Sequence, residues 1–180
     1  MRIREAKPTD ALGIAKVHVD SWRETYVGIV PDEYLARLSY KQREQVWQNL
    51  ITTAPKRGAD VLVVEYDEGR IVGFADGGPA REEVSSYESE LYAIYILKKH
   101  QGKGLGTQLV SLITQRLLKD GMNSMMLWVL SRNPYHHFYE ALEGERFKRR
   151  YVVIGGAKFL ELAYGWSDIR LLATANSSVS

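Results

Sequence analysis

The chain has 180 residues, of which 45% are hydrophobic and 26% are charged. This is the length of one ordinary domain and the composition of a globular protein, which excludes wholesale disorder. Its 24 basic and 22 acidic side chains leave a net charge of +2, so no general affinity for polyanions is expected. The chain has no cysteine, which excludes disulfides, cysteine nucleophiles and cysteine-based zinc sites.

Membrane insertion and export are not expected from the sequence. The longest plainly apolar run, Met125–Leu130, is far shorter than the ~20 residues that a membrane helix needs. Charged residues such as Arg2, Arg4 and Lys7 occupy the start of the chain, where a signal peptide would need an apolar stretch. We therefore expect a soluble, cytoplasmic protein that makes no contact with a membrane.

Hydrophobic periodicity in the first half of the chain predicts a strand, two helices and a β-hairpin. In chain order these elements cover residues 1–5 (strand), 8–27 (helix), 31–51 (helix), 61–66 (strand) and 71–75 (strand). Pro8 and Pro31 begin the two helices, and Gly28 ends the first one. The segment 54–60 is expected to be a loop because it holds a proline and a glycine, and 80–89 is expected to be a polar loop.

The second half of the chain predicts alternating strands and helices, followed by a closing hairpin. The elements cover residues 91–97 (strand), 105–120 (helix), 124–130 (strand), 133–142 (short helix), 146–154 (strand) and 158–166 (strand). The run 91–97 is continuously apolar, which is typical of a strand covered on both faces. This order predicts a mixed α/β sheet in a single domain over 1–168, followed by a C-terminal tail over 169–180 that is small and polar from Ala173.

A glycine-rich loop joins the buried strand 91–97 to the next helix. Its glycines would let backbone amides approach a ligand closely, and the helix start would attract phosphate through its unpaired amides and dipole. Positive charge is added by Lys98, Lys99 and Lys103. A tight turn with no ligand is the simpler alternative. The loop lacks the Gly-Lys-Ser/Thr frame of a P-loop and the third glycine of a dinucleotide fingerprint.

The sequence Gln-x-x-Gly-x-Gly over 101–106 resembles the pyrophosphate-binding motif of the GCN5-related N-acetyltransferase (GNAT) family. The sequence Asn-Pro-Tyr-His-His-Phe-Tyr-Glu over 133–140 is similar to a second motif of that family, and 21–35 looks like its bacterial small-molecule members. The resemblance covers residues 1 to about 168. It implies the GNAT fold, a mostly antiparallel sheet whose two central strands splay apart.

The resemblance also implies acetyl-CoA as co-substrate and no metal. The amides of 101–106 would hold the pyrophosphate, and the backbone of Ile94 and Ile96 would pair with the pantetheine arm like an added strand. Asn133 would bond the same arm, cap the following helix, or do both. The expected cofactor-binding residues are Ile94, Tyr95, Ile96, Gln101, Gly102, Lys103, Gly104, Leu105, Gly106, Thr107, Asn133 and Tyr139.

Tyr139 is the expected acid for the leaving thiolate, with simple packing as the alternative. A thiol pKa of ~8.5 against ~10 for tyrosine makes full proton transfer uphill by roughly 2 kcal/mol, so Tyr139 should act mainly as a hydrogen-bond donor. The acceptor amine must be neutral to attack, so a base would help. By resemblance that base is Glu90, with Glu88 and Asp76 as alternatives and a solvated carboxylate as the simpler interpretation.

The acceptor is expected to be a primary amine of a small molecule or of an amino terminus, attacked directly in a ternary complex. Its pocket would be lined by Trp22, Tyr26, Tyr34 and Glu88. Aromatic faces could hold a cationic amine, although Trp22 could equally be an ordinary core residue. Specificity is expected in 22–34 and 78–89, whose carboxylates would suit that cation.

Two functions other than an enzyme are alternatives for this sequence. A catalytically silent acetyl-CoA-binding sensor of the same fold is the main alternative. Nucleic-acid binding is not expected, because the basic residues at 146 and 148–150 read as a solvated strand face. A homodimer is a possible assembly.

Overall fold

The computed structural model describes residues 1–81 and 87–174. The strands are β1 (Arg2–Glu5), β2 (Asp60–Tyr66), β3 (Arg70–Pro79), β4 (Ser89–Ile96), β5 (Met125–Leu130), β6 (Glu145–Ile154) and β7 (Ala157–Trp166). The helices are α1 (Ala11–Tyr26), α2 (Asp32–Arg37), α3 (Tyr40–Arg57), α4 (Leu105–Lys119), α5 (His137–Ala141) and α6 (Arg170–Thr174). None of the helices in the described ranges is long and apolar enough to cross a membrane.

All seven strands join one sheet in the order β1-β2-β3-β4-β5-β7-β6. Every neighbouring pair is antiparallel except β4 and β5, which run parallel. This confirms the predicted mixed α/β sheet. The parallel pair lies in the middle of the sheet, where the two antiparallel halves meet.

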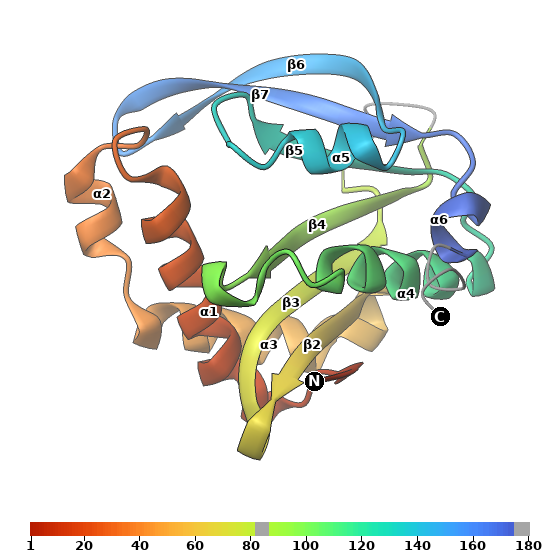
Figure 1. Ribbon diagram of the computed structural model, residues 1–180, viewed down its shortest axis with the longest axis horizontal. Helices are drawn as coiled ribbons and strands as arrows, with labels where there is room; N and C mark the ends of the chain where they lie inside the picture. Colours follow the sequence, from red (N-terminus) through yellow and green to blue (C-terminus); the bar gives the residue numbers. More distant parts are fainter. Residues whose placement is uncertain (82–86, 175–180) are drawn as a thin grey trace.

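The two central strands separate soon after they begin. Residue pairing between β4 and β5 is limited to Ser89 with Met125 and Glu90 with Met126. Further along, the register between β3 and β4 skips Tyr92, which marks a bulge on β4. A bulge bends its strand, and β4 diverges from β5 toward the carboxyl ends of both strands (Figure 1). The sheet is therefore open at its centre.

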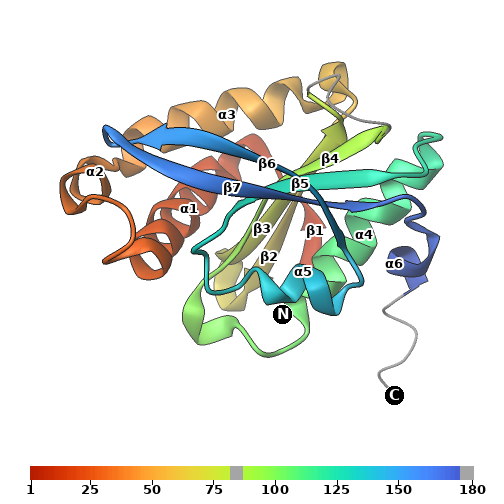
Figure 2. The same ribbon diagram turned by 90° about the horizontal axis from the view of Figure 1, so that it is seen from above.

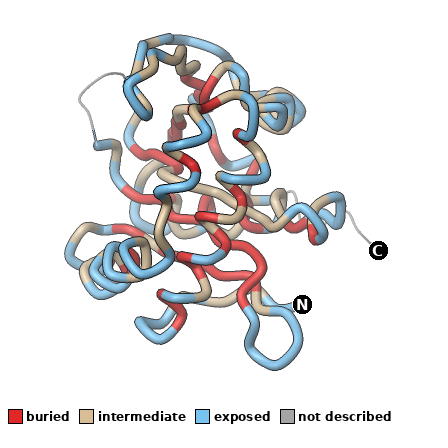
Figure 3. Tube along the Cα trace, turned by 90° about the vertical axis from the view of Figure 1, so that its left-hand side faces the viewer, coloured by how far each residue is buried: buried red, intermediate tan, exposed pale blue. Residues whose placement is uncertain are grey.

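Helices pack on both faces of the sheet (Figure 2). On one face, α4 contributes Leu109, Ile113 and Leu117, which recur at helical spacing and are at most 1% exposed. On the other face, α1 and α3 pack against β2 and β3 around residues such as Phe74 and Trp47. The buried residues follow the central strands, and the loops are mostly exposed (Figure 3). This packing leaves the opening of the sheet accessible.

The predicted helix over 31–51 consists of two helices, α2 and α3. The chain breaks at residues 38–39, where the Ser39 hydroxyl caps α3 by accepting a hydrogen bond from the Gln42 amide at 3.4 Å. The predicted loop over 54–60 is also wrong, because α3 continues through Pro55. A proline in the last helical turn removes few bonds, and Gly58 ends the helix in the left-handed region.

The first residues of the C-terminal tail pack into the core of the domain. Ile169 is fully buried and Leu172, in α6, is 6% exposed, and both belong to the core cluster of α4. The Ser111 hydroxyl donates to the carbonyl of Ala173 at 2.8 Å. Part of the predicted loop over 80–89, residues 82–86, and the end of the tail lie outside the described residues.

Candidate active site

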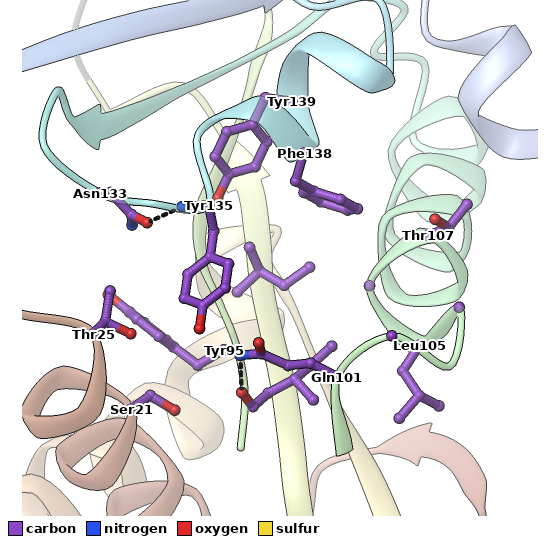
Figure 4. Close-up of a pocket in the computed structure, with 15 residues that line it drawn as sticks. Ser21, Thr25, Tyr95, Gln101, Leu105, Thr107, Asn133, Tyr135, Phe138 and Tyr139 are labelled. Atoms are coloured by element: carbon purple, nitrogen blue, oxygen red, sulfur yellow. Dashed lines mark hydrogen bonds between the residues drawn. The ribbon is translucent and has the colours of Figure 1, made fainter. Parts of the chain in front are cut away.

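A cleft of about 440 Å³ opens between the end of β4, the start of α4, α1 and the segment leading into α5 (Figure 4). We call it the glycine cleft. Its lining residues are Ser21, Thr25, Ile94, Tyr95, Ile96, Gln101, Gly102, Gly104, Leu105, Gly106, Thr107, Asn133, Tyr135, Phe138 and Tyr139. It therefore contains every predicted cofactor-binding residue except Lys103, which is exposed beside it.

Two glycines shape the loop at the entrance of α4. Gly102 and Gly104 have φ values of 70° and 74°, a left-handed conformation that favours glycine. A Cβ atom at Gly102 would meet nothing within 4 Å, and one at Gly104 only the Gln108 amide nitrogen at 3.9 Å. The Gln101 side chain anchors the loop by donating to the carbonyl of Ile96 at 2.9 Å. The loop is thus held in place with its backbone uncovered.

The third glycine has a different role. Gly106 has an ordinary helical conformation, but a Cβ atom there would lie 3.1 Å from the Phe138 ring. Its absence lets α4 approach the segment that carries Tyr139. The first-turn amides of α4, including that of Gly106, have no partner within the helix. Such amides, together with the helix dipole, suit a phosphate group at one end of the glycine cleft.

The opposite wall of the glycine cleft carries an unsatisfied hydroxyl. Ser21 on α1 is 4% exposed, and its Oγ has no hydrogen-bond partner among the residues that the structure describes. Thr25 lies one turn further along the same helix and also lines the cleft. Buried hydroxyls are normally paired, so Ser21 fits a ligand with polar groups along its length. Phosphate at one end and polar groups beyond it match an acyl-CoA.

A second cavity, of about 180 Å³, lies where β4 and β5 separate. We call it the splay pocket. Aromatic and charged side chains dominate its wall, namely Trp22, Tyr26, Arg81, Tyr92, Tyr95, Trp128, Tyr139, Arg150 and Glu161. Four residues line both cavities, and these are Ile94, Tyr95, Asn133 and Tyr139. The two cavities therefore meet at these side chains.

Tyr139 is in α5, and its hydroxyl makes no hydrogen bond to a described residue. Its ring contacts those of Phe138 and Tyr164, with centroids 5.4 and 5.8 Å away. Burial raises the pKa of Tyr139 above its usual value, so the phenol keeps its proton at neutral pH. A protonated hydroxyl at the junction of two cavities can donate to an anion that forms there.

Hydrogen bonds fix the aromatic side chains around Tyr139. Asn133 donates through Nδ2 to the Tyr26 hydroxyl at 2.9 Å, and its Oδ1 accepts from the Tyr135 amide at 2.8 Å. Trp22 donates through Nε1 to the Tyr95 hydroxyl at 3.0 Å. Asn133 therefore closes a turn that precedes α5, and it does not cap that helix, whose N-cap is His136. Binding of the pantetheine arm stays a prediction.

The predicted base Glu90 is 3% exposed and lies outside the lining of both cavities. Its two oxygens accept hydrogen bonds from the Arg81 guanidinium, one of them from Nε at 3.1 Å. The alternative base Asp76 is 3% exposed, and burial raises its pKa to about 6 although Arg57 lies 3.9 Å away. Neither carboxylate is brought to Tyr139, so the identity of the base stays a prediction.

The predicted acceptor residues are only partly brought together. Trp22 and Tyr26 line the splay pocket, but Tyr34 lies behind Trp22, with ring centroids 5.9 Å apart, and packs beneath Gly155. Glu88 lies at the start of β4, where it accepts a hydrogen bond from the Asn123 amide. Tyr34 and Glu88 are therefore absent from the described lining of both cavities.

Several lining residues were missed from the sequence. Ser21 and Thr25 lie in α1, where the apolar periodicity predicts the helix but does not show which polar residues line a cleft. Arg150 was assigned to a solvated strand face, but its guanidinium carbon lies 4.0 Å from the centre of the Trp128 ring, and its Nε donates to Glu161 at 2.8 Å. The sequence did contain a signal. Arg150 is two and four positions from Val152 and Ile154, so it shares the face of β6 on which these two apolar residues pack inward.

One group of side chains near α5 has the composition of a metal site. Ligand atoms of His136, His137 and Glu140 lie within 4.8 Å of one another. Glu140 is already bound by Arg146 and accepts from the Tyr164 hydroxyl at 2.9 Å. Its charge is thus balanced by an arginine, and the group lies outside the lining of both cavities.

A sheet that opens at a central parallel pair, with a glycine-lined helix start beside the opening, is typical of acyl-CoA-dependent acyltransferases. The acetyltransferase (GNAT) family model matches residues 18–143, and the chain belongs to this family. This confirms the family, the fold and the acetyltransferase activity predicted from the sequence, with acetyl-CoA as co-substrate.

Known proteins are similar over most of the chain. An uncharacterized N-acetyltransferase of Bacillus subtilis (strain 168), YuaI, is 41% identical and covers 96% of both chains. An L-methionine sulfoximine/L-methionine sulfone acetyltransferase of Pseudomonas aeruginosa is 25% identical over 73% of this chain and 72% of its own length. YncA of Salmonella typhimurium, solved with its cofactor acetyl-CoA, has a TM-score of 0.67 at 20% identity and covers 92% of both chains.

Proposed function

We propose that this acetyltransferase transfers the acetyl group directly from acetyl-CoA to a primary amine of a small molecule. The observation that carries the proposal is the shared wall of the two cavities, because Tyr139 and three other residues line both. An arm in the glycine cleft and an amine in the splay pocket would meet there. Such placement favours attack without a covalent enzyme intermediate.

The chemistry of the step assigns a role to the Tyr139 hydroxyl. The neutral amine nitrogen forms a bond to the thioester carbonyl carbon, and the carbon–sulfur bond breaks. Tyr139 donates a hydrogen bond to the departing thiolate and shares its proton with it as the charge develops. Its raised pKa suits a donor that stays protonated until that moment. The attacking nitrogen loses one proton, to a base or to water, to give the neutral amide, and a proton from the solvent replaces any that Tyr139 has passed to the thiolate.

Glu90 remains the proposed base, with one condition that its contacts impose. Arg81 binds both oxygens of this carboxylate, so Glu90 would need to loosen from Arg81 or act through water. A carboxylate held in this way is equally suited to fixing Arg81 in place. The two roles predict different effects of removing the charge, and this difference can be measured.

Two observations favour a small molecule over a protein amino terminus. The splay pocket has a volume of about 180 Å³, similar to that of a cavity that holds a benzene-sized ligand. Its walls come from β4, β5, β6 and α1, which leave room for a compact acceptor. The Pseudomonas aeruginosa relative is named for small-molecule acceptors, L-methionine sulfoximine and L-methionine sulfone.

The proposal is tested by measuring thiol release from acetyl-CoA with a panel of polyamines, aminoglycosides, amino acids and peptides. We expect release with at least one small amine and mass-spectrometric detection of its acetylated product. Binding of acetyl-CoA without turnover of any acceptor would instead support the sensor. Turnover confined to peptides would contradict the small-molecule assignment.

A further inference from the structure

The charges that face the splay pocket do not suit a simple cationic amine. Among its described lining residues, the charged ones are Arg81, Arg150 and Glu161. The single carboxylate, Glu161, already accepts a hydrogen bond from Arg150 at 2.8 Å. A polyamine would therefore meet two guanidinium groups and no uncommitted carboxylate among these residues. The carboxylates predicted to attract a cation, such as Glu88, are elsewhere or outside the described residues.

The guanidinium groups of both arginines lie over aromatic rings that line the same pocket. The guanidinium carbon of Arg81 lies 4.6 Å from the centre of the Tyr92 ring, and that of Arg150 lies 4.0 Å from the Trp128 ring. Contact with an aromatic face restrains a guanidinium without using its N–H donors. The two groups come from distant segments, because Arg81 follows the end of β3 and Arg150 lies in β6.

The ion pair of Arg81 leaves part of its guanidinium available. Arg81 donates to Glu90 through Nε and Nη2, and Nη1 makes no hydrogen bond to a described residue. The Arg81 side chain is 57% exposed, whereas Glu90 behind it is only 4% exposed. Glu90 thus orients Arg81 from the buried side. Arg81 lines the splay pocket, where a planar anion could accept hydrogen bonds from its remaining N–H groups.

Resting on the proposed function, we infer that the acceptor is an amine that also carries a carboxylate, as an amino acid does, and that Arg81 and Arg150 bind this carboxylate. The amine would then be presented toward Tyr139, which lines the same pocket. Guanidinium groups recognise carboxylates through paired, charge-assisted hydrogen bonds, which suits these two arginines better than any contact with a cation. The arginines act in substrate binding and take no part in proton transfer.

The test compares acceptors that differ only in the carboxylate. The twenty common L-amino acids are assayed for thiol release beside their amides and their decarboxylated amines. For the best amino acid, we expect kcat/KM to exceed that of its amide by roughly ten- to a hundredfold, the effect of losing hydrogen bonds to a charged group. An amide or a decarboxylated amine that reacts as well as the acid would overturn the inference.

Substitution of Arg150 tests whether this side chain recognises the carboxylate of the acceptor. Arg150→Gln should lower the ratio of kcat/KM between acid and amide toward one, chiefly through the KM of the acid, and Arg150→Lys should restore part of it. Arg149→Gln, on the exposed opposite face of β6, is the matched control and should leave the ratio unchanged. An unchanged ratio in Arg150→Gln would remove that arginine from recognition.

The outcomes also separate this inference from the acetyltransferase proposal. Acetylation of plain amines but not of amino acids would overturn carboxylate recognition and leave direct acetyl transfer to amines intact. Absence of thiol release with every acceptor would overturn both. The wild-type comparison needs no variant to fold, so it decides the inference even if loss of Arg150 destabilises the chain.

Discussion

Replacing Gly104 with alanine should produce two separable effects. The residue has a φ of 74°, so a side chain there strains the backbone by about 1–2 kcal/mol. The added Cβ would meet only the Gln108 amide nitrogen at 3.9 Å, so no clash inside the fold adds to this cost. For a chain of this size, the melting temperature should fall by about 2–8 °C.

The second effect concerns the cofactor. Gly104 lines the glycine cleft at the helix start that is proposed to hold the pyrophosphate. A methyl group in that open space would separate the phosphate from the backbone amides. Loss of charge-assisted hydrogen bonds of this kind corresponds to roughly a ten- to hundredfold rise in Kd. Cofactor affinity should therefore fall in addition to the loss of stability.

Gly121→Ala is the matched control. Gly121 has a φ of 84°, and a Cβ atom there would meet nothing within 4 Å, but it lies past the far end of α4. Both variants should lose similar stability without ligand. At acetyl-CoA equal to one hundred times the wild-type Kd, wild type and Gly121→Ala should gain about 2.7 kcal/mol. Gly104→Ala, with tenfold weaker binding, should gain only about 1.4 kcal/mol.

Thermal unfolding with and without acetyl-CoA, together with a direct binding titration, measures both quantities. If Gly104→Ala loses stability like Gly121→Ala yet gains as much from acetyl-CoA, the glycine serves only the turn. The pyrophosphate site would then have to be placed elsewhere. A common failure of both variants to fold would contradict the estimated strain.

Three further predictions concern the acidic and phenolic groups. Tyr139→Phe should lower kcat about a hundredfold with little change in acetyl-CoA affinity, and unchanged turnover at saturation would remove Tyr139 from the mechanism. If Glu90 is the base, Glu90→Gln should flatten the acidic limb of the pH–rate profile. If Glu90 only positions Arg81, the variant should raise the KM of the acceptor and leave the pH profile unchanged. Burial raises the pKa of Asp76 from 3.8 to about 6. Ionising Asp76 in the folded state therefore lowers the free energy of unfolding by about 3 kcal/mol. This loss is absent below pH 4 and complete above pH 6. Asp76→Asn should therefore be more stable than wild type in urea unfolding at pH 8 but not at pH 4, and equal stabilities at pH 8 would contradict this.

Much of the fold follows from local patterns in the sequence. The continuous apolar run in β4 and the amphipathic pattern of α4 were visible because burial imposes its own periodicity. The glycine loop was recognisable because positive φ values and close backbone approach both require glycine. These signals depend on residues near one another in the chain, so the glycine cleft was predicted with few errors.

The splay pocket was much harder to predict, because it depends on contacts between distant segments. The bulge at Tyr92 interrupts a strand whose unbroken apolar sequence shows no change in period. Arg81 and Arg150 are 69 positions apart in the printed sequence, and only the sheet order brings them to one cavity. Tyr34 and Glu88 lie outside the described lining of the splay pocket for the same reason. Tyr34 packs against Gly155, and Glu88 accepts a hydrogen bond from Asn123, both from remote segments.

The central claim is that acetyl transfer occurs directly where the glycine cleft meets the splay pocket. Initial rates of thiol release, measured over a grid of acetyl-CoA and acceptor concentrations, test it most directly. The proposed ternary complex predicts double-reciprocal lines that intersect, and no acetylated protein after incubation with acetyl-CoA alone. Parallel lines, together with an acetylated protein that passes its acetyl group to the amine, would contradict it.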